Sequence, residues 1–390
     1  MRVALGVCVL HAIGCGSAPR PAADPAPPAS EVVLAARYSF APQPQATLSA
    51  REVAWVARCG KPDAALFVVA RALASERAAG GAMPDTEQIA RRLREAGAPY
   101  VWPVAVGLSG SARDRDVEER LDALRAQVDK DGEARCGFGL VETPPANGYA
   151  ASRHLVAIAV ANLGTFEKLP VHTEPGRALI AQAQLAQPLR SASAYLLGPS
   201  GDPKSVQVTL SPRKDALTVR FAPAGDGEYL LQMLGDLGSG PRPLFEALVV
   251  SGKGSARSER SNEPPASDDE AGVLARINAL RASHGHKPLV MDPALSTLAL
   301  AHAQDMAQKQ KLAHDVGNGT PDARVKRAGL ALRVVGENVS FAKGVIAAHE
   351  GIERSPSHRA NVLRAEFTKV GIGFVRGPDG MVYLAEIFGG

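Results

Sequence analysis

Two short stretches near the C-terminus decide the fold of the last part of the chain: Gly336-Glu337-Asn338-Val339-Ser340 and Ser355-Pro356-Ser357-His358-Arg359-Ala360-Asn361-Val362-Leu363. They belong to an otherwise amphipathic segment that begins at His314. Histidine and glutamate side chains exchange protons near neutral pH and bind divalent metals. His314, Glu337 and His358 are therefore candidates for one functional site.

Helix and strand signals surround this segment on both sides. Asp268-Asp269-Glu270 is expected to cap one helix, and Asp292 is expected to cap the next, with proline at its first helical position. A short helix is expected from Thr320-Pro321 to Gly329, and another from about 343 to 354. Strands are expected at 370–374 and 382–388, joined by a turn. This pattern predicts an α+β domain of stacked layers at 269–390.

Six motifs follow one another in this region in a fixed order. They are Ile277-Asn278-Ala279-Leu280-Arg281, Ala301-His302-Ala303-Gln304-Asp305-Met306, Ala313-His314, Gly336-Glu337-Asn338, Ser355 to Leu363, and Val370-Gly371-Ile372-Gly373-Phe374. Their order and spacing resemble the CAP superfamily of cysteine-rich secretory, antigen 5 and pathogenesis-related 1 proteins, in particular its bacterial SCP-like extracellular branch. The resemblance covers nearly a third of the 390 residues.

The resemblance implies an α-β-α sandwich with a cleft, and it places His314, Glu337 and His358 in that cleft. Two imidazoles and one carboxylate can hold Zn²⁺ with an open position. Without metal they can exchange protons. The third interpretation is a buried polar network that only stabilises the fold.

Two positions depart from the family pattern. The family usually has tryptophan near Ile352, and the second cleft glutamate of eukaryotic members falls at about Ser355. Glu350 and Glu353 are nearby, but periodicity leaves their direction open. His302 is expected to be a satisfied core or helix-surface histidine rather than a ligand. The remaining histidines of this region are expected in loops or on exposed faces: His284, His286 and His349.

Residues 50–162 repeat the order of the last domain. Ala65-Leu66 parallels Ala294-Leu295, and Cys136-Gly137-Phe138-Gly139-Leu140 parallels Val370 to Phe374. The sequence therefore predicts a degenerate CAP-like α+β domain; the alternative is an unrelated helical domain.

The site residues are missing from this predicted copy. Val104-Ala105-Val106 stands where Gly336-Glu337-Asn338 would be, Leu73 stands near the place of His302, and residues 59–153 contain no histidine. The same shell would then exist without the site.

A β-sandwich-like domain is expected at 165–250, where short apolar segments alternate with Gly- and Pro-containing turns. His172 in this region is expected on the surface. A polar linker at 251–268 follows.

The N-terminus is typical of an export signal. Residues 1–15 contain an apolar run too short to span a bilayer and end in a lipobox-like Ala12-Ile13-Gly14-Cys15. Lipidation of Cys15 would anchor the chain to a membrane surface through the Pro- and Ala-rich tether at 16–48; the alternative is an ordinary cleaved signal peptide. Cys59 and Cys136 would form a disulfide in an exported protein, or remain separate buried thiols.

Three functions remain open at this point. The first is a lipid-anchored envelope module, on the outer membrane or a periplasmic face, or a secreted module, that binds a lipid, glycan or protein ligand. The second is a metal-dependent, peptidase-like hydrolase that uses His314, Glu337 and His358, although HExxH and GxSxG motifs are missing. The third is a structural envelope protein. A net charge of +4 without a basic block gives no reason to expect nucleic-acid binding.

Overall fold

The computed structural model describes residues 48–111, 113–128, 130–144, 152–167, 169–253 and 267–390. Cys15, the export signal and the tether lie outside these residues, as does most of the linker. Within the described ranges, no helix has both the length and the apolar character needed to cross a membrane.

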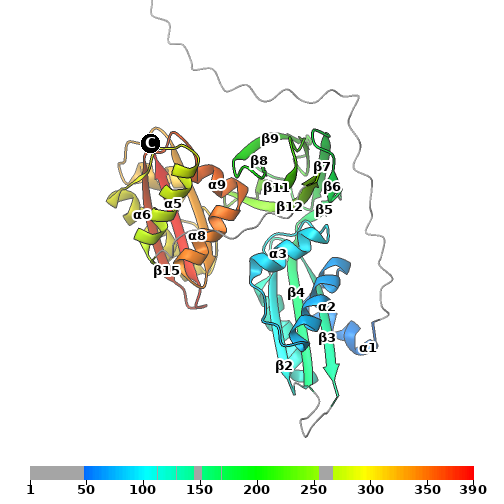
Figure 1. The fold of residues 1–390 in the computed structure, drawn as a ribbon. Coiled ribbons are helices and arrows are strands. Elements are labelled where there is room, and N and C mark those ends of the chain that lie inside the picture. The colour runs from blue at the N-terminus through cyan, green and yellow to red at the C-terminus, as the bar shows by residue number, and fades with distance from the viewer. Residues whose placement is uncertain (1–47, 112, 129, 145–151, 168, 254–266) are drawn as a thin grey trace, which may run out of the picture.

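The first part of the chain folds around a four-stranded sheet of order β1-β3-β4-β2 (Figure 1). β1 pairs with β3 in parallel, and the other pairs are antiparallel. Its elements are α1 (Ala50–Cys59), β1 (Lys61–Pro62), α2 (Ala64–Ala78), α3 (Thr86–Glu95), β2 (Val104–Gly110), α4 (Asp114–Gln127), β3 (Glu133–Thr143) and β4 (Ser152–Asn162).

The middle part is built from β-strands in the order β5-β7-β10-β9-β8-β11-β12-β6. β9 pairs with β8 through its first residues and with β10 through its last, so it joins two groups of strands. Both groups contribute side chains to one apolar core, which agrees with the β-sandwich-like prediction. The strands are β5 (Gly164–Phe166), β6 (His172–Thr173), β7 (Leu179–Leu185), β8 (Ala192–Leu197), β9 (Pro203–Leu210), β10 (Ala216–Phe221), β11 (Gly227–Asp236) and β12 (Pro241–Ser251).

The last part has a second four-stranded sheet, of order β13-β15-β16-β14. Separate apolar clusters on its two faces involve α5 and α8 on one face and α6 and α7 on the other. This is the predicted α-β-α layering. The elements are α5 (Glu270–Ser283), β13 (Val290–Met291), α6 (Pro293–Lys309), α7 (Pro321–Arg327), β14 (Val335–Ala342), α8 (Val345–Arg354), α9 (Pro356–Val362), β15 (Lys369–Arg376) and β16 (Val382–Gly389).

Two glycines allow α6 to lie directly on β15. A Cβ atom at Gly371 would be 2.1 Å from the carbonyl carbon of Leu295, and one at Gly373 would be 2.1 Å from the amide nitrogen of Leu300. Any side chain there would force the helix away from the strand. The helix that contains His302 is thereby held against the sheet.

The first sheet has the same strand order and strand directions as the last, and the same element order except that α9 has no counterpart among the described residues of the first part. The same glycine contact recurs, because a Cβ at Gly137 would be 2.5 Å from the carbonyl carbon of Leu66 in α2. The predicted central sheet and helices of the copy are therefore present; a common origin of the two units stays a proposal.

The strand register also aligns the two units at the site. Glu337 pairs with Ile387 on β16, and Ala105 pairs with Ile158 at the equivalent point of β4. Ala105 thus occupies the position that corresponds to Glu337.

A disulfide joins Cys59 to Cys136, with 5.7 Å between the Cα atoms. Cys59 ends α1, and Cys136 lies within β3. The bond ties the first helix to the sheet on which it packs.

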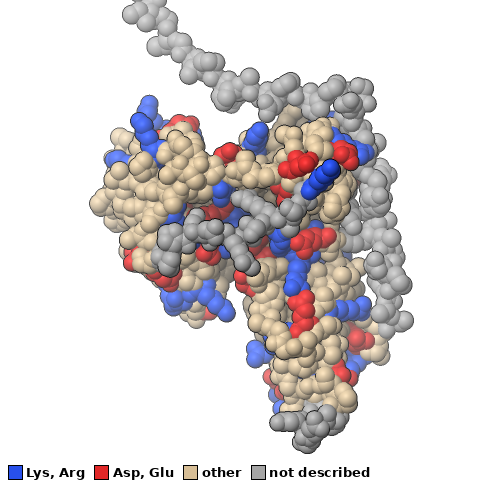
Figure 2. Space-filling view, in the orientation of Figure 1, with Lys and Arg blue, Asp and Glu red and all other residues tan. Residues whose placement is uncertain are grey.

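The middle part contacts both neighbours. β12 packs against α3 of the first part, and β8, β9 and β11 pack against α9 of the last (Figure 1). On the face drawn in Figure 2, basic and acidic side chains are interspersed over all three parts.

Candidate functional site

His314 and Glu337 form the centre of the site. His314 lies in the loop after α6, and its Nδ1 is 2.9 Å from Oε1 of Glu337 on β14. The Glu337 side chain is buried, whereas that of His314 is 16% exposed. Arg324 of α7 donates to the other carboxylate oxygen. Burial alone would raise the pKa of Glu337, but His314, His302 and Arg324 together lower it, so the carboxylate is ionised.

His302 adjoins this pair from α6. Its Nε2 is 3.1 Å from the Ala313 carbonyl oxygen, to which it must donate, and 3.7 Å from Oε1 of Glu337. Its Nδ1 then accepts from the Asn318 amide at 3.0 Å. Burial lowers the pKa of His302. It is a satisfied core histidine, as expected, and it also forms one wall of the carboxylate site.

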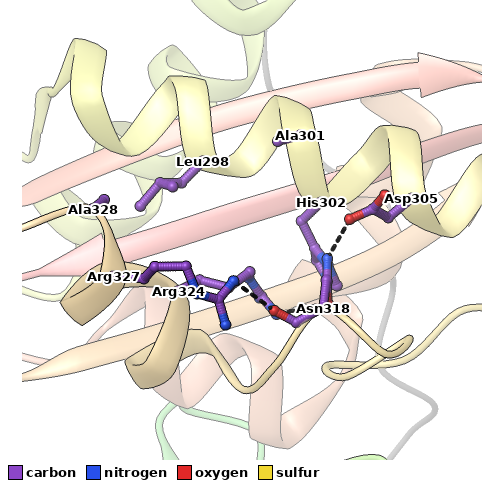
Figure 3. Close-up of a pocket in the computed structure, with 8 residues that line it drawn as sticks. All are labelled: Leu298, Ala301, His302, Asp305, Asn318, Arg324, Arg327 and Ala328. Carbon is purple, nitrogen blue, oxygen red and sulfur yellow. Dashed lines mark hydrogen bonds between the residues drawn. The ribbon is translucent and has the colours of Figure 1, made fainter.

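A cavity of about 290 Å³ opens between α6 and α7, on the side of His302 and Arg324 (Figure 3). Arg324 is 5% exposed, and its Nε has no hydrogen-bond partner among the described residues. The cavity is lined by Leu298, Ala301, His302, Asp305, Asn318, Arg324, Arg327 and Ala328.

His358 lies near the start of α9 and is half-buried. Burial and the neighbouring His314 lower the pKa of His358 to about 3, so its imidazole is neutral at pH 7. Its backbone carbonyl accepts from the Asn338 side chain at 3.2 Å. The structure thus bonds His314 directly to Glu337 and brings His358 close to His314.

A second buried cluster lies behind Asn338. His349 of α8 has Nδ1 2.6 Å from Glu386 and Nε2 3.2 Å from Glu353. Arg276 of α5 pairs with Glu353 at 2.5 Å. Asn338 also donates to Glu386 at 3.3 Å, so it links this cluster to His358.

The prediction that His349 lies in a loop or on an exposed face is wrong, because His349 is fully buried. It shares the inward face of α8 with Val345 and Ile352, at the i, i+4, i+7 spacing of a core stripe. That spacing was the signal in the sequence. Glu353, whose direction had been open, points inward to His349.

The second cluster is charged at neutral pH. Burial opposes the protonated form of His349, but the two carboxylates outweigh it and raise its pKa to about 9. Burial likewise opposes ionised Glu353, yet His349 and Arg276 lower its pKa to about 2. Two cations therefore neutralise two carboxylates in a water-poor interior.

The remaining positions are simpler. Ile352 fills the core where the family usually has tryptophan, and Ser355 faces the middle part of the chain. His172 is exposed, as expected; His284 and His286 are half-buried at the end of α5.

The trio does not suit a divalent cation as it stands. Both oxygens of Glu337 are engaged, one by His314 and the other by the Arg324 guanidinium, whose positive charge repels a metal ion. Within the described ranges, no group of three or more His, Cys, Asp or Glu side chains is placed to hold a metal. Zinc binding by His314, Glu337 and His358 stays a prediction that a metal assay must decide.

The C-terminal part is a sheet with helices on both faces and a His–Glu pair on its edge strand. Residues 274–388 match the family model named CAP, the Cysteine-rich secretory protein family, which confirms the resemblance seen in the sequence.

Two curated Bacillus subtilis (strain 168) proteins are similar to this part of the chain. The "Uncharacterized protein YkwD" is 34% identical over 124 residues, which are 31% of this chain and 47% of that protein. The "Uncharacterized membrane protein YlbC" is 28% identical over 110 residues, or 27% and 32% of the two chains. This chain therefore spans about half or less of the length of these relatives.

Solved structures are similar at low TM-scores. An extracellular protein containing a SCP domain from Bacillus anthracis str. Ames has a TM-score of 0.28 and 19% identity, covering 54% of this chain and 85% of that one. An outer surface protein from Borrelia burgdorferi has a TM-score of 0.29 and 19% identity, covering 30% and 88% of the two chains. Values this low carry no argument about function.

Proposed function

We propose that the protein is an exported envelope or extracellular module whose CAP domain binds a lipid, glycan or protein ligand at the His314–Glu337–His358 cleft. The observation that carries the proposal is the pairing of partly exposed His314 with buried, ionised Glu337. This pair presents a fixed imidazole to a ligand, and neutral His358 adds a second polar group beside it.

The proposed location rests on two features. The N-terminus has the pattern of an export signal, and the Cys59–Cys136 disulfide is a bond typical of oxidising compartments. Anchoring through Cys15 is proposed from the sequence alone. Cys15→Ser should move the protein from the membrane fraction to the soluble fraction; retention in the membrane would overturn the anchor.

Ligand binding is tested on the full chain purified from its host. Native mass spectrometry would look for a bound small molecule, and lipid vesicles and glycan panels would test the chemical classes directly. We expect His358→Ala to lose the ligand and His172→Ala to keep it. Equal retention by both variants, or no binding of any class, would count against the cleft as the binding site.

The hydrolase alternative is tested by metal analysis of the same preparation. Stoichiometric Zn²⁺ that disappears in both His314→Ala and His358→Ala would support it. The Arg324–Glu337 ion pair leads us to expect no stoichiometric zinc.

A further inference from the structure

The turn between β11 and β12 lies directly on His314. It comprises Leu237 to Gly240. A Cβ atom at Gly240 would be 2.7 Å from Cβ of His314, so the two residues are in close contact. The Ser239 carbonyl oxygen accepts from the backbone N–H of Asp315 at 3.0 Å.

The turn is also held in shape from its own side. Oδ1 of Asp236 accepts from the N–H groups of Gly238 at 2.6 Å and Gly240 at 3.1 Å. Gly240 has a backbone φ of +101°, a conformation that residues other than glycine rarely adopt. The turn is thus a preformed element that fits over the imidazole.

Gln232 of β11 caps the helix that carries His358. The N-cap residue of α9, Ser355, makes no capping bond with its own side chain. Oε1 of Gln232 accepts instead from the Ser357 N–H at 3.0 Å, and its Nε2 donates to the Ser355 hydroxyl at 3.1 Å. Because Gln232 is 1% exposed, these bonds are shielded from water.

Gln232 is in turn connected to the first part of the chain. Its Nε2 donates to Glu246 of β12 at 2.8 Å, and the other oxygen of Glu246 accepts from Arg94 of α3 at 2.7 Å. On the far side, Arg359 of α9 donates to the Gly201 carbonyl oxygen at 2.6 Å. One connected set of polar contacts therefore runs from α3 through the middle sheet to α9.

We propose that the middle domain is an intramolecular lid of the CAP cleft. The β11–β12 turn covers His314, Gln232 positions the helix of His358, and a ligand reaches the pair when the turn withdraws. The occupant of the cleft mouth in the closed state is this chain's own Leu237–Gly240 segment. The inference rests on the proposed function only in taking the cleft as the binding site.

The lid is tested by the reactivity of histidines toward diethyl pyrocarbonate, followed residue by residue by peptide mass spectrometry on the full chain. In the native protein, His314 and His358 should react at least several-fold more slowly than exposed His172. Gly240→Ala should raise the rate at His314 several-fold, because the added methyl group pushes the turn off the imidazole. Gln232→Ala should raise the rate at His358, because α9 loses its cap.

Gln184→Ala is the matched control, since its amide bonds to Asp215 within the middle domain at 3.1 Å, and the two cleft rates should stay at native values. Circular dichroism would check that each variant is folded. If Gln232→Ala does not fold, the result for Gly240→Ala decides alone. Unchanged rates at both cleft histidines in folded Gly240→Ala, or native rates equal to that of His172, would overturn the lid.

The labelling needs no ligand, so its outcome is separate from that of the proposed function. Faster labelling without binding of any ligand class supports the lid and counts against the cleft as a binding site. If the native protein binds a ligand but His314 and His358 are labelled as fast as His172, the cleft is supported as the binding site and the lid is overturned.

Discussion

The buried His349 cluster makes a quantitative prediction about pH and stability. The pKa of His349 is about 9 in the folded protein against 6.5 for an ordinary histidine. At 1.36 kcal/mol per pH unit, this difference corresponds to a contribution of about 3 kcal/mol to folding. Because the folded pKa is raised, the contribution is complete below pH 6.5 and is lost as the pH rises to about 9.

His349→Leu removes this contribution and leaves Glu353 and Glu386 with less compensating charge. Breaking a buried ion pair in this way costs about 3–5 kcal/mol. We therefore expect the variant to be less stable by about that amount at pH 6.5. The gap to the native protein should shrink by about 3 kcal/mol between pH 6.5 and pH 9, since only the native protein has an imidazolium to lose.

Hydrogen–deuterium exchange is the suitable assay, because a chain of several domains does not unfold in one step. Peptides that cover β16, which contains Glu386, report the opening free energy of the C-terminal domain alone. His172→Leu is the control and should leave these peptides unchanged. A gap that stays constant from pH 6.5 to pH 9 would refute the charged state of His349.

Three further predictions concern the cleft and the disulfide. Glu337→Gln should reduce the opening free energy of the same peptides by about 3 kcal/mol, because the buried Arg324 guanidinium loses its counter-charge; a loss below about 1 kcal/mol would contradict the ion pair. An NMR titration of the His358 ring should give a midpoint well below pH 6.5, near 3, so that acid destabilises the fold below pH 6.5; a midpoint at 6.5 would show a solvated ring. Replacing both disulfide cysteines by serine should cost the first domain about 4 kcal/mol, given a sequence separation of 77 residues. Both tryptophans lie in that domain, so their fluorescence during urea unfolding reports the unfolding of that domain. Equal urea midpoints for the native protein and the serine variant would show that the disulfide does not stabilise it.

Much of the fold was predictable from capping residues. Asp292 and Thr320 are N-caps in the structure, as the sequence indicated, and Asp269 is the N-cap within the predicted Asp268-Asp269-Glu270 cap. Their side chains accept from backbone N–H groups that a helix start leaves free. The helix over 356–362 was not predicted. It is too short for a periodic pattern, and part of its cap comes from Gln232, more than a hundred positions away.

The predicted site residues His314, Glu337 and His358 each belong to a sequence motif, whereas the residues of the second cluster belong to none. Glu386 lies in an otherwise apolar strand, so no sequence pattern marks it as a site residue. Its partner His349 comes from another element, α8. Gln232 has no signal either, since a glutamine in a strand is ordinarily a surface residue, whereas here it is buried and bonded to α9 of another domain. Contacts between domains are set by surface shape, which a periodic pattern does not encode.

The capping of α9 by the middle domain also bears on the order in which the chain folds. The chain is synthesised N-terminus first, so the segment with β11 and Gln232 always precedes residues 355–363 and is available to fold before them. If the middle domain folds first, the helix with His358 forms against a partner that already supplies part of its N-terminal cap. A circular permutation that places the CAP segment before the β-strands would reverse this order. Helix α9 would then lack its Gln232 cap until β11 had been synthesised.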